Sequence, residues 1–494
     1  MSVAETVVAE ATLDAKGSLR SRVLSAGAWS LASYAGSQVI RLGSSMVMTR
    51  LLMPEAYGLY TLVSTYMVGI VMFSDVGLGA YLFQSKRAHD QVFADSIWTL
   101  AVTRGVIVWC VGLALAWPMS HFYNQPVLLP MLAVGSLGLL LNTLQSTKLT
   151  LASRDLKQKE LVVFGITNQV VAIAIQLALA WWFRSVWALV IGGLLSEMIR
   201  VMGSQFLFPG QRNHWCWDPA LVKELRSFST WVYLSSIMFF VGGQADRLIL
   251  GKIMPMEFLG VYGIAMTFAT LPLALVQQGS GLISPVVVQL RHRNDSAIQQ
   301  KLQEARGLLL RVGAILVALM CVTAPAFYGF LYDRRYAGAA TIAALLAVNI
   351  WSTVLQVSAS SIPLAFGDSR STAYMSASRM LGTVVGMLVG YRLGGVYGLV
   401  VGAAGGDIAM YVTSVIAARR HRIHLDWAIS STLFLIGLIA IGSGVSWVLS
   451  RYVLSPRCSS VAGGAALLLA VLLVERTQLV WLFDAIRKRF TIET

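Results

Sequence analysis

The sequence predicts an all-α polytopic membrane protein with about fourteen transmembrane helices, and three observations support this. Apolar residues make up 56% of the 494 residues and charged residues only 12%, roughly half the charged share of a soluble domain. Stretches of about 20 apolar residues, enough to cross a bilayer core, recur along the chain. The basic residues behind the net charge of +15 lie in short clusters between these stretches, which indicates membrane topology and excludes a nucleic-acid surface.

The expected spans share this length and composition. They cover residues 24–49, 57–83, 93–117, 127–152, 161–183, 186–208, 228–253, 257–285, 306–331, 338–366, 371–392, 396–418, 430–449 and 459–482. No connection between them is long enough to form a separate domain. The longest connections are 209–227 and 286–305, and the second resembles a charged, solvated helix.

The distribution of Lys and Arg predicts the orientation. With a cytoplasmic N-terminus, the inner connections and tails carry 22 of these residues and the outer connections carry 8. The positive-inside rule therefore favours two cytoplasmic termini and an even number of spans. Residues 1–22 hold six charged residues and no apolar run, so we interpret them as a cytoplasmic tail and not as a signal peptide.

An internal repeat predicts the domain organisation. The segment that begins at Glu55 and the one that begins at Glu257 match at an offset of 202 residues, each after the outer end of a span. Because six spans separate the copies, the halves are expected to be parallel repeats with a substrate cleft between them. The expected parts are a tail (1–22), a six-helix bundle (23–208), a cytoplasmic linker (209–227), a second six-helix bundle (228–418), an additional helix pair (419–482) and a cytoplasmic tail (483–494).

At these residues the chain resembles a known family. The run Arg50–Tyr60, the turn Asp75–Gly79 and the segment Asp246–Gly251 are similar to the polysaccharide-transport branch of the multidrug/oligosaccharidyl-lipid/polysaccharide exporter superfamily. Gly307–Arg311 and Val186–Val190 fit the same pattern. The resemblance covers roughly residues 24–420 and is strongest to exopolysaccharide repeat-unit flippases of the colanic-acid and xanthan type.

This resemblance implies a V-shaped pair of six-helix bundles in a bacterial inner membrane. It implies alternating access, with undecaprenyl-diphosphate-linked oligosaccharide as the substrate and transfer from the cytoplasmic to the periplasmic leaflet for exopolysaccharide synthesis. Other polysaccharide assembly proteins are implied partners. Many members have twelve spans, so the last two of the fourteen expected spans differ from the usual number in this family.

Polar side chains on spanning helices predict the walls of the cleft, because such side chains are costly in lipid. Matching stripes on the first and seventh spans each end in an arginine, Arg41 and Arg247. Two guanidinium groups suit the two phosphates of a diphosphate, and Arg104 on the third span is a third candidate. The other expected cleft-lining residues are Ser37, Gln38, Ser44, Tyr233, Ser236, Gln244, Asn349 and Gln356. Alternatives remain open: Arg41 pairs with another helix, and Arg247 pairs with Asp246 or snorkels outward.

Other charges in the spans have two interpretations, as ion pairs or as groups that couple transport to protons or sodium. Glu197 and Arg200 lie three residues apart on one helix, a spacing that favours a pair. Arg379 and Asp407 lie at similar depth on neighbouring spans. Asp246 belongs to the same group. Lys148, near an inner boundary, is expected to snorkel.

Several function classes lose support. The four cysteines are far apart and show no metal-ligand spacing, and no nucleotide-binding glycine loop occurs, so we expect no catalytic residues, cofactor or metal. The spans hold more arginines than carboxylates, which favours an anionic substrate over the cation of a multidrug exporter. A polysaccharide polymerase or ligase is a remote alternative, because no long outer loop is present.

Overall fold

The computed structural model describes residues 33–74, 77–85, 90–155, 157–280, 296–366, 368–452 and 455–474, together with residues 29, 87 and 287. Every element in these ranges is helical. Nine of their helices are long and apolar enough to cross a membrane, or ten if one bent pair forms a single span. Within the described residues, each of the fourteen expected spans overlaps a helix or a pair of helices. The chain is therefore an all-α, multi-pass membrane protein.

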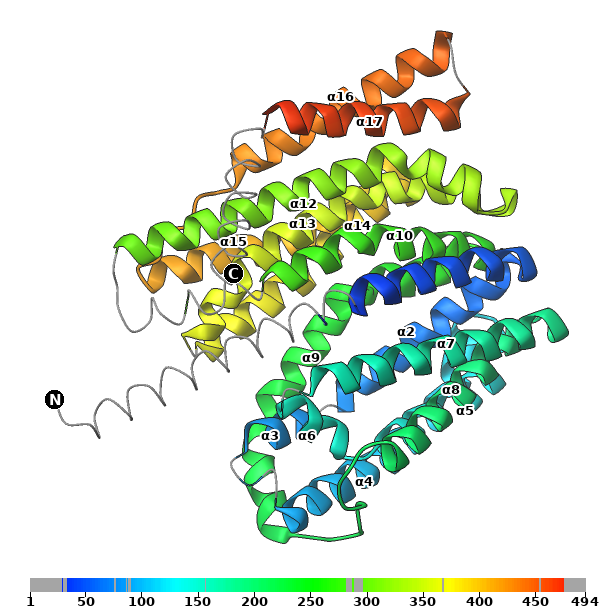
Figure 1. The fold of residues 1–494 in the computed structure, drawn as a ribbon, viewed down its shortest axis with the longest axis vertical. Helices are drawn as coiled ribbons and strands as arrows, with labels where there is room; N and C mark the ends of the chain where they lie inside the picture. Colours follow the sequence, from blue (N-terminus) through cyan, green and yellow to red (C-terminus); the bar gives the residue numbers. More distant parts are fainter. Residues whose placement is uncertain are drawn as a thin grey trace, which may run out of the picture. The chain divides into compact units, whose positions relative to one another are not determined.

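The chain divides into two compact units (Figure 1). The first contains Met1–Leu52 and Leu59–Ile237, and the second contains Met53–Gly58 and Met238–Thr494. The expected tails 1–22 and 483–494 lie outside the described residues. Helix α9 begins at Pro219, inside the expected linker, and the boundary between the units passes through it.

The first unit begins with a helix over residues 33–51. It continues with most of α2 (Pro54–Ser74) and with α3 (Leu78–Gln84), α4 (Gln91–Phe122), α5 (Leu128–Thr143), α6 (Lys148–Arg154), α7 (Gln158–Phe183), α8 (Trp187–Phe206) and the start of α9 (Pro219–Ile253). Within this unit α4 packs on α5, and α8 packs on both α5 and α7. The fourth span is broken, because α5 and α6 meet at 57°.

Neighbouring residues satisfy the backbone groups that this break exposes. The amide of Ser146 donates to the hydroxyl of Ser204 in α8 at 3.0 Å, and the amide of Thr147 donates to the side-chain oxygen of Asn213 at 3.1 Å. Unpaired amides are costly in a membrane interior. The connection after α8 therefore stabilises the broken span.

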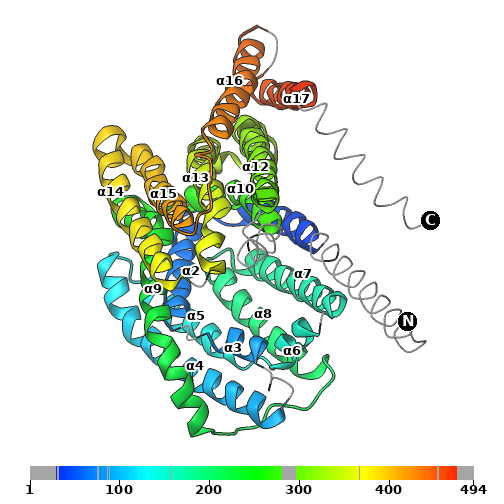
Figure 2. The ribbon, with the colours of Figure 1, turned by 90° about the vertical axis from the view of Figure 1, so that its left-hand side faces the viewer.

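The second unit contains the rest of α9 and α10 (Met256–Ser280), α12 (Ser296–Leu331), a 3₁₀ turn (Arg334–Tyr336), α13 (Ala339–Ala365), α14 (Ser369–Gly402), α15 (Ala404–Arg420), α16 (Ile429–Tyr452) and α17 (Pro456–Val474). The additional pair, α16 and α17, packs against α12, and the end-on view in Figure 2 shows α16 and α17 side by side. Helix α12 begins at Ser296, so part of the expected solvated connection 286–305 is an extension of a span. Residues 281–286 and 288–295 lie outside the described residues.

Residues 369–420 form a helical hairpin that we call the glycine hairpin. It turns at Gly394 and Gly395, where Gly395 has φ 59°, a value that favours glycine. A Cβ at Gly390 would collide with the carbonyl oxygen of Gly398, and one at Gly386 would collide with that of Gly402. The two helices therefore pack backbone to backbone, as helices with glycine at every fourth residue do in membranes.

The internal repeat is visible within the second unit, which includes the start of α2. A Cβ at Gly58 would collide with the carbonyl oxygen of Met256, and a Cβ at Gly260 would collide with that of Pro54. These pairs are equivalent under the offset of 202 residues. Each copy therefore places its glycine on the first helical residue of the other copy, which is a local two-fold arrangement.

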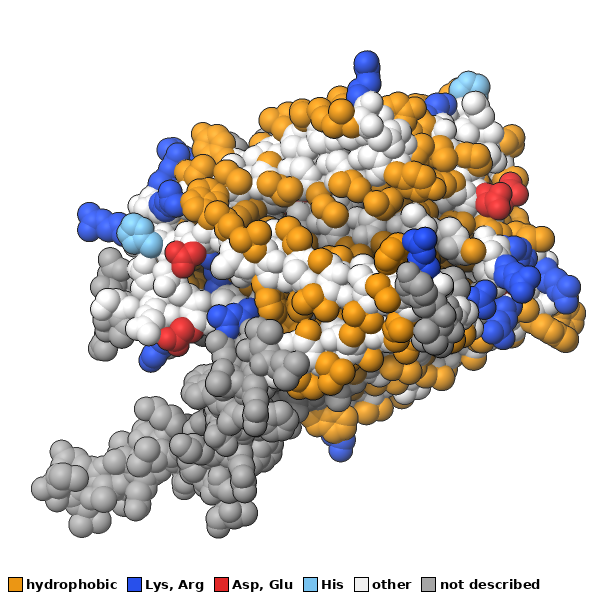
Figure 3. Space-filling view, turned by 90° about the horizontal axis from the view of Figure 1, so that it is seen from above, with side chains coloured by type: hydrophobic (Ala, Val, Ile, Leu, Met, Phe, Trp, Pro, Cys, Tyr) orange, Lys and Arg blue, Asp and Glu red, His pale blue; other side chains and the backbone are white. Residues whose placement is uncertain are grey.

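The surface matches the bilayer assignment. Figure 3 shows apolar side chains over most of the drawn face and charged side chains mainly toward its margins. At one end of α7, Trp181 and Trp182 are 67% and 78% exposed. Exposed tryptophans at a helix end are typical of a membrane interface.

Candidate functional site

The first unit carries two of the three arginines expected to bind phosphate. Arg41 is exposed on the helix over residues 33–51, and Arg104 is half-buried on α4. The hydroxyl of Ser44 donates to the backbone carbonyl of Arg41 at 2.9 Å. Ser37 accepts a hydrogen bond through its carbonyl from Gln169 of α7 at 2.9 Å. Gln38 is also half-buried on this helix.

The second unit carries Arg247, which is half-buried on α9. Its guanidinium donates to the side-chain oxygen of Gln244. Asp246, 8% exposed, accepts a hydrogen bond from the hydroxyl of the fully buried Tyr262. Among the described residues Asp246 and Arg247 thus have separate partners, and the geometry does not show the ion pair between them that was one of the alternatives. Ser236 is half-buried on the same helix, and the side chain of Tyr233 lies outside the described residues.

The polar face of α13 contacts other helices. The amide nitrogen of Asn349 donates to the carbonyl of Val400 at 2.8 Å, and the hydroxyl of Thr353 donates to Asp407 at 2.5 Å. Gln356 is buried at 8% exposure. For Asn349 and Thr353 the geometry therefore shows helix–helix hydrogen bonding.

Arg379 of α14 and Asp407 of α15 form an ion pair inside the glycine hairpin. The distance from Nε of Arg379 to a carboxylate oxygen of Asp407 is 2.8 Å, and each side chain is 11% exposed. The guanidinium also lies 4.5 Å from the ring centre of Phe239 on α9. Gly242 leaves space for it, because a Cβ there would meet the arginine stem at 3.1 Å.

The second expected pair, Glu197 and Arg200, lies on α8 with 3.6 Å between charged atoms. The side-chain amides of Asn142 and Gln145 both approach Glu197 at 3.4 Å. These amides were not among the predicted site residues. Their spacing of three on one helix face was the signal in the sequence that could have indicated a shared partner.

Two buried cations differ from expectation. We expected Lys148 to snorkel, but it is 7% exposed and its ammonium donates to the carbonyls of Gln205 and Phe208 at 3.0 and 3.2 Å. It therefore satisfies carbonyls at the end of α8. Arg306 was expected at the boundary of the span 306–331, but it lies inside α12, is 4% exposed and donates to the carbonyl of Asp426 and the hydroxyl of Tyr411.

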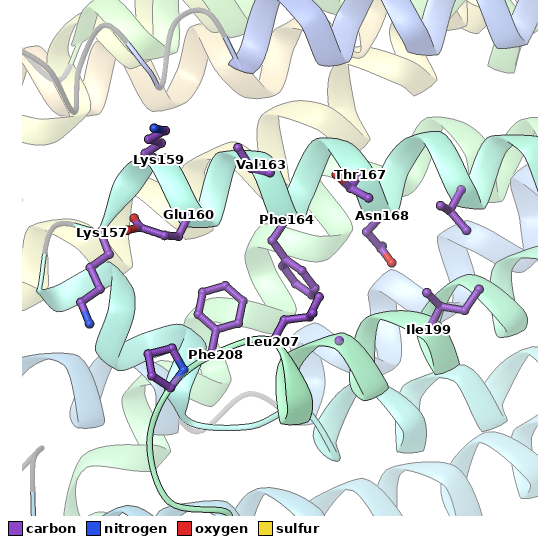
Figure 4. Close-up of a pocket in the computed structure, with 13 residues that line it drawn as sticks. Lys157, Lys159, Glu160, Val163, Phe164, Thr167, Asn168, Ile199, Leu207 and Phe208 are labelled. Atoms are coloured by element: carbon purple, nitrogen blue, oxygen red, sulfur yellow. The ribbon is translucent and has the colours of Figure 1, made fainter.

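A pocket that the sequence did not predict lies in the first unit between α7 and α8 (Figure 4). Its volume is about 550 Å³, within the roughly 300–1,000 Å³ range of ligand pockets. Phe164 of α7 and Phe208, after α8, meet edge to face in it at 5.3 Å. Gly203 allows the Phe164 ring to pack directly against α8, because a Cβ there would lie 2.6 Å from that ring. The described residues contain no group of side chains suited to holding a metal ion.

Comparison with known proteins supports the expected family. Residues 47–292 match the family model described as polysaccharide biosynthesis protein. The chain is 21% identical over 332 residues to the succinoglycan biosynthesis transport protein of Rhizobium meliloti (strain 1021), with 65% of each chain covered. It is 24% identical over 258 residues to the amylovoran biosynthesis protein of Erwinia amylovora, covering 49% of this chain and 63% of that one. The chain spans slightly less than two thirds of the length of these relatives.

Solved structures show the same fold. The lipid II flippase in an inward closed conformation aligns with a TM-score of 0.67 at 10% identity, covering 91% of this chain and 99% of that one. An inward-facing multidrug transporter of the MATE family aligns with a TM-score of 0.60 at 13% identity, covering 78% of this chain and 94% of that one. The succinoglycan relative and these neighbours are named as transporters or flippases and not as enzymes. Together the matches show that this chain is similar to proteins of polysaccharide biosynthesis and transport.

Proposed function

We propose that the chain is a flippase that moves undecaprenyl-diphosphate-linked oligosaccharide units from the cytoplasmic to the periplasmic leaflet for exopolysaccharide synthesis. The transport cycle is alternating access between the two halves. The protein works in the bacterial inner membrane with both termini in the cytoplasm, alongside other polysaccharide assembly proteins. The relatives named for polysaccharide biosynthesis and transport support this substrate class.

The observation that carries the proposal is the state of Arg247. Its guanidinium donates to the neutral side chain of Gln244, while the nearby carboxylate of Asp246 accepts a hydrogen bond from Tyr262. Among the described residues the guanidinium has no carboxylate within ion-pair distance. A guanidinium at membrane depth that is not paired with a carboxylate is suited to an anionic substrate.

Arg41 and Arg247 are proposed to hold the diphosphate, with Arg104 as a third contributor. Arg41 is exposed and so is accessible to a ligand. The planar guanidinium fork forms paired hydrogen bonds with phosphate oxygens that an ammonium group cannot reproduce. Charge-assisted hydrogen bonds of this kind contribute about 1.5–3 kcal/mol each. Losing one arginine should therefore weaken binding by about ten- to a hundredfold.

The test uses purified protein in vesicles with lipid-linked oligosaccharide in one leaflet and no ATP. Arg41→Gln and Arg247→Gln should each lower flipping by about ten- to a hundredfold, and the Lys variants should recover only part of it. Arg335→Gln is the matched control, because Arg335 already pairs with Asp333 at 2.9 Å. The wild type should flip without nucleotide, and adding a proton or a sodium gradient identifies the coupling ion.

Three results would contradict parts of this proposal. Full flipping by Arg41→Gln, or by the double variant Asp246→Asn/Arg247→Gln, would remove the diphosphate clamp. Transport of an organic cation without flipping of the lipid would favour the multidrug exporter. A strict need for ATP would exclude a gradient-driven or passive cycle.

A further inference from the structure

The pocket between α7 and α8 changes in chemistry along its length. Lys157 and Lys159 lie at one end, where α7 begins, with Glu160 beside them, so that end has a net positive charge. Further along α7 the walls are mainly apolar, with Val163, Phe164 and Val171, and the polar side chains there are those of Thr167 and Asn168. Figure 4 shows Lys157 and Lys159 at one end of the row and Asn168 far along the helix from them.

The length of the pocket matches one leaflet. Lys157 and Val171 are fourteen positions apart, and at about 1.5 Å per residue this is about 21 Å. Half of a bilayer core is about 15 Å. The pocket therefore runs from the interface to about the middle of the membrane. The exposed Trp181 and Trp182 near the other end of α7 mark the opposite interface.

The pocket is open toward the lipid. Val163 on α7 and Leu207, just after α8, are 52% and 72% exposed. Only 6% of the apolar window of α7 is buried inside the structure, so most of this helix is accessible from outside its unit. In a bilayer an apolar trough of this kind is filled by a hydrocarbon chain. A cationic end at the interface above it would attract a lipid with an anionic headgroup.

We propose that this pocket binds the lipid carrier of the substrate, a single isoprenoid chain with a phosphate or diphosphate head, in the cytoplasmic leaflet. The head group lies at Lys157 and Lys159, and the first isoprene units lie against Phe164 and Phe208. One trough between two helices accommodates one chain, which favours the isoprenoid over a phospholipid with two acyl chains. The inference rests on the proposed function and on the cytoplasmic position of the start of α7. It assigns this pocket to capture of the carrier before transport.

Gly203 provides a variant that fills the pocket and a control on the same helix. Gly203→Leu adds a side chain whose Cβ would lie only 2.6 Å from the Phe164 ring. Gly193→Leu, also on α8, points into open space, because nothing lies within 4 Å of a Cβ at that position. Lys157→Gln/Lys159→Gln removes the cationic end, and Lys301→Gln removes an exposed charge on α12 as its control.

The experiment uses full-length protein in nanodiscs and a polyprenyl phosphate with a photoreactive group on its chain, followed by peptide mapping. Label should appear in the peptides of α7 and α8 that contain Phe164 and Gly203. Gly203→Leu should lower it about tenfold or more, because the new side chain occupies the trough. In the double lysine variant, each lysine replaced should lower the amount of label about fivefold. Both controls should be labelled like the wild type. Size-exclusion profiles verify folding, and the lysine variant serves as the test if Gly203→Leu does not fold.

Three outcomes overturn the inference. The first is label that maps outside α7 and α8, and the second is label that stays unchanged in the lysine variant. The third is equal competition by a diacyl anionic phospholipid, which would make the pocket a general lipid site. The vesicle assay separates this failure from that of the proposed function. A wild type that flips the lipid-linked unit but is labelled elsewhere refutes only the pocket assignment, whereas a wild type that does not flip refutes the function and the pocket assignment with it.

Discussion

Two antiparallel helix pairs, one in each unit, use glycine to contact different groups. In the glycine hairpin of the second unit, residues 369–420, glycines face each other and the backbones touch. Between α7 and α8 of the first unit, Gly203 contacts the ring of Phe164, and the pair lines a pocket of about 550 Å³. Glycine therefore permits close contact in both pairs, with a backbone in one and with an aromatic ring in the other. The second pair also leaves space for a ligand beside the contact.

The two pairs also differ in how they hold charge. The glycine hairpin contains a buried ion pair between Arg379 and Asp407, with Thr353 hydrogen-bonded to the carboxylate. The pocket between α7 and α8 places its lysines at one end, beside open space. We therefore expect the hairpin to be a fixed part of its unit and the α7–α8 pair to be a binding surface. Variants in the glycine hairpin test whether it is a fixed part of its unit.

The largest expected effect concerns the ion pair of the glycine hairpin. Arg379→Gln and Asp407→Asn should each destabilise the protein by about 3–5 kcal/mol, because each leaves one buried charge without its partner. The double variant should be close to the wild type, since no unpaired charge remains. Thermal unfolding in one detergent, followed by size-exclusion chromatography, measures all four proteins.

The same variants distinguish a structural pair from a coupling group. A double variant that unfolds like the wild type and still flips substrate supports a structural role. A double variant of normal stability that no longer responds to an ion gradient would show that Arg379 and Asp407 couple transport, and the hairpin would then not be a fixed part.

A smaller effect is expected from the glycine contact itself. Gly386→Ala places a Cβ against the carbonyl oxygen of Gly402, and overpacking of this kind typically costs about 1–3 kcal/mol. Gly444→Ala on α16 is the matched control, because nothing lies within 4 Å of a Cβ there. The unfolding temperature should fall only for Gly386→Ala. Equal unfolding temperatures for the two variants would mean that the hairpin is not closely packed.

The sequence predicted the spans well because their signal is local. Apolar runs and clustered basic residues are visible without knowledge of the fold, and all fourteen expected spans overlap helices within the part of the chain that the structure describes. The break between α5 and α6 was not predicted, because the groups that stabilise it, Ser204 and Asn213, are distant in sequence. Lys148 was predicted wrongly for the same reason, since its carbonyl partners belong to another helix.

The site was predictable only in part. Spacing on one helix suggested the pair Glu197–Arg200, and similar depth on neighbouring spans suggested the pair Arg379–Asp407. The structure brings both pairs together. The partners of Asp246 and Arg247 were not predictable, because Tyr262 lies on the next helix and Gln244 competes for the guanidinium. The pocket depends on Gly203 lying opposite Phe164, which no pattern in one sequence specifies. The roles of Arg41, Arg104 and Arg247 in binding phosphate stay predictions.

The smallest expected effect is a pH dependence at one end of the glycine hairpin, outside the membrane spans. Asp368 caps α14, and hydrogen bonds from Ser371, with a further contribution from His421, lower the pKa of its carboxyl to about 2. A carboxyl whose pKa is lowered on folding stabilises the protein above its unfolded pKa of about 3.9. That stabilisation is lost as the pH falls from about 4 toward 2. Because the side chain is 24% exposed, solvent screening should keep the effect below about 1 kcal/mol.

Asp368→Asn isolates this effect from the other carboxyl groups that titrate in the same range. At pH 6 the variant should unfold slightly below the wild type, and the difference should shrink as the pH approaches 2, because the wild-type carboxyl then also becomes neutral. Ser371→Ala removes the largest cause of the lowered pKa, so its difference from the wild type should shrink over the same range. Unfolding temperatures measured at several pH values between 2 and 6 give all three curves. A difference between Asp368→Asn and wild type that stays constant with pH would show that the cap acts through its shape and hydrogen bonds alone, and that its charge contributes nothing to closing this end of the hairpin.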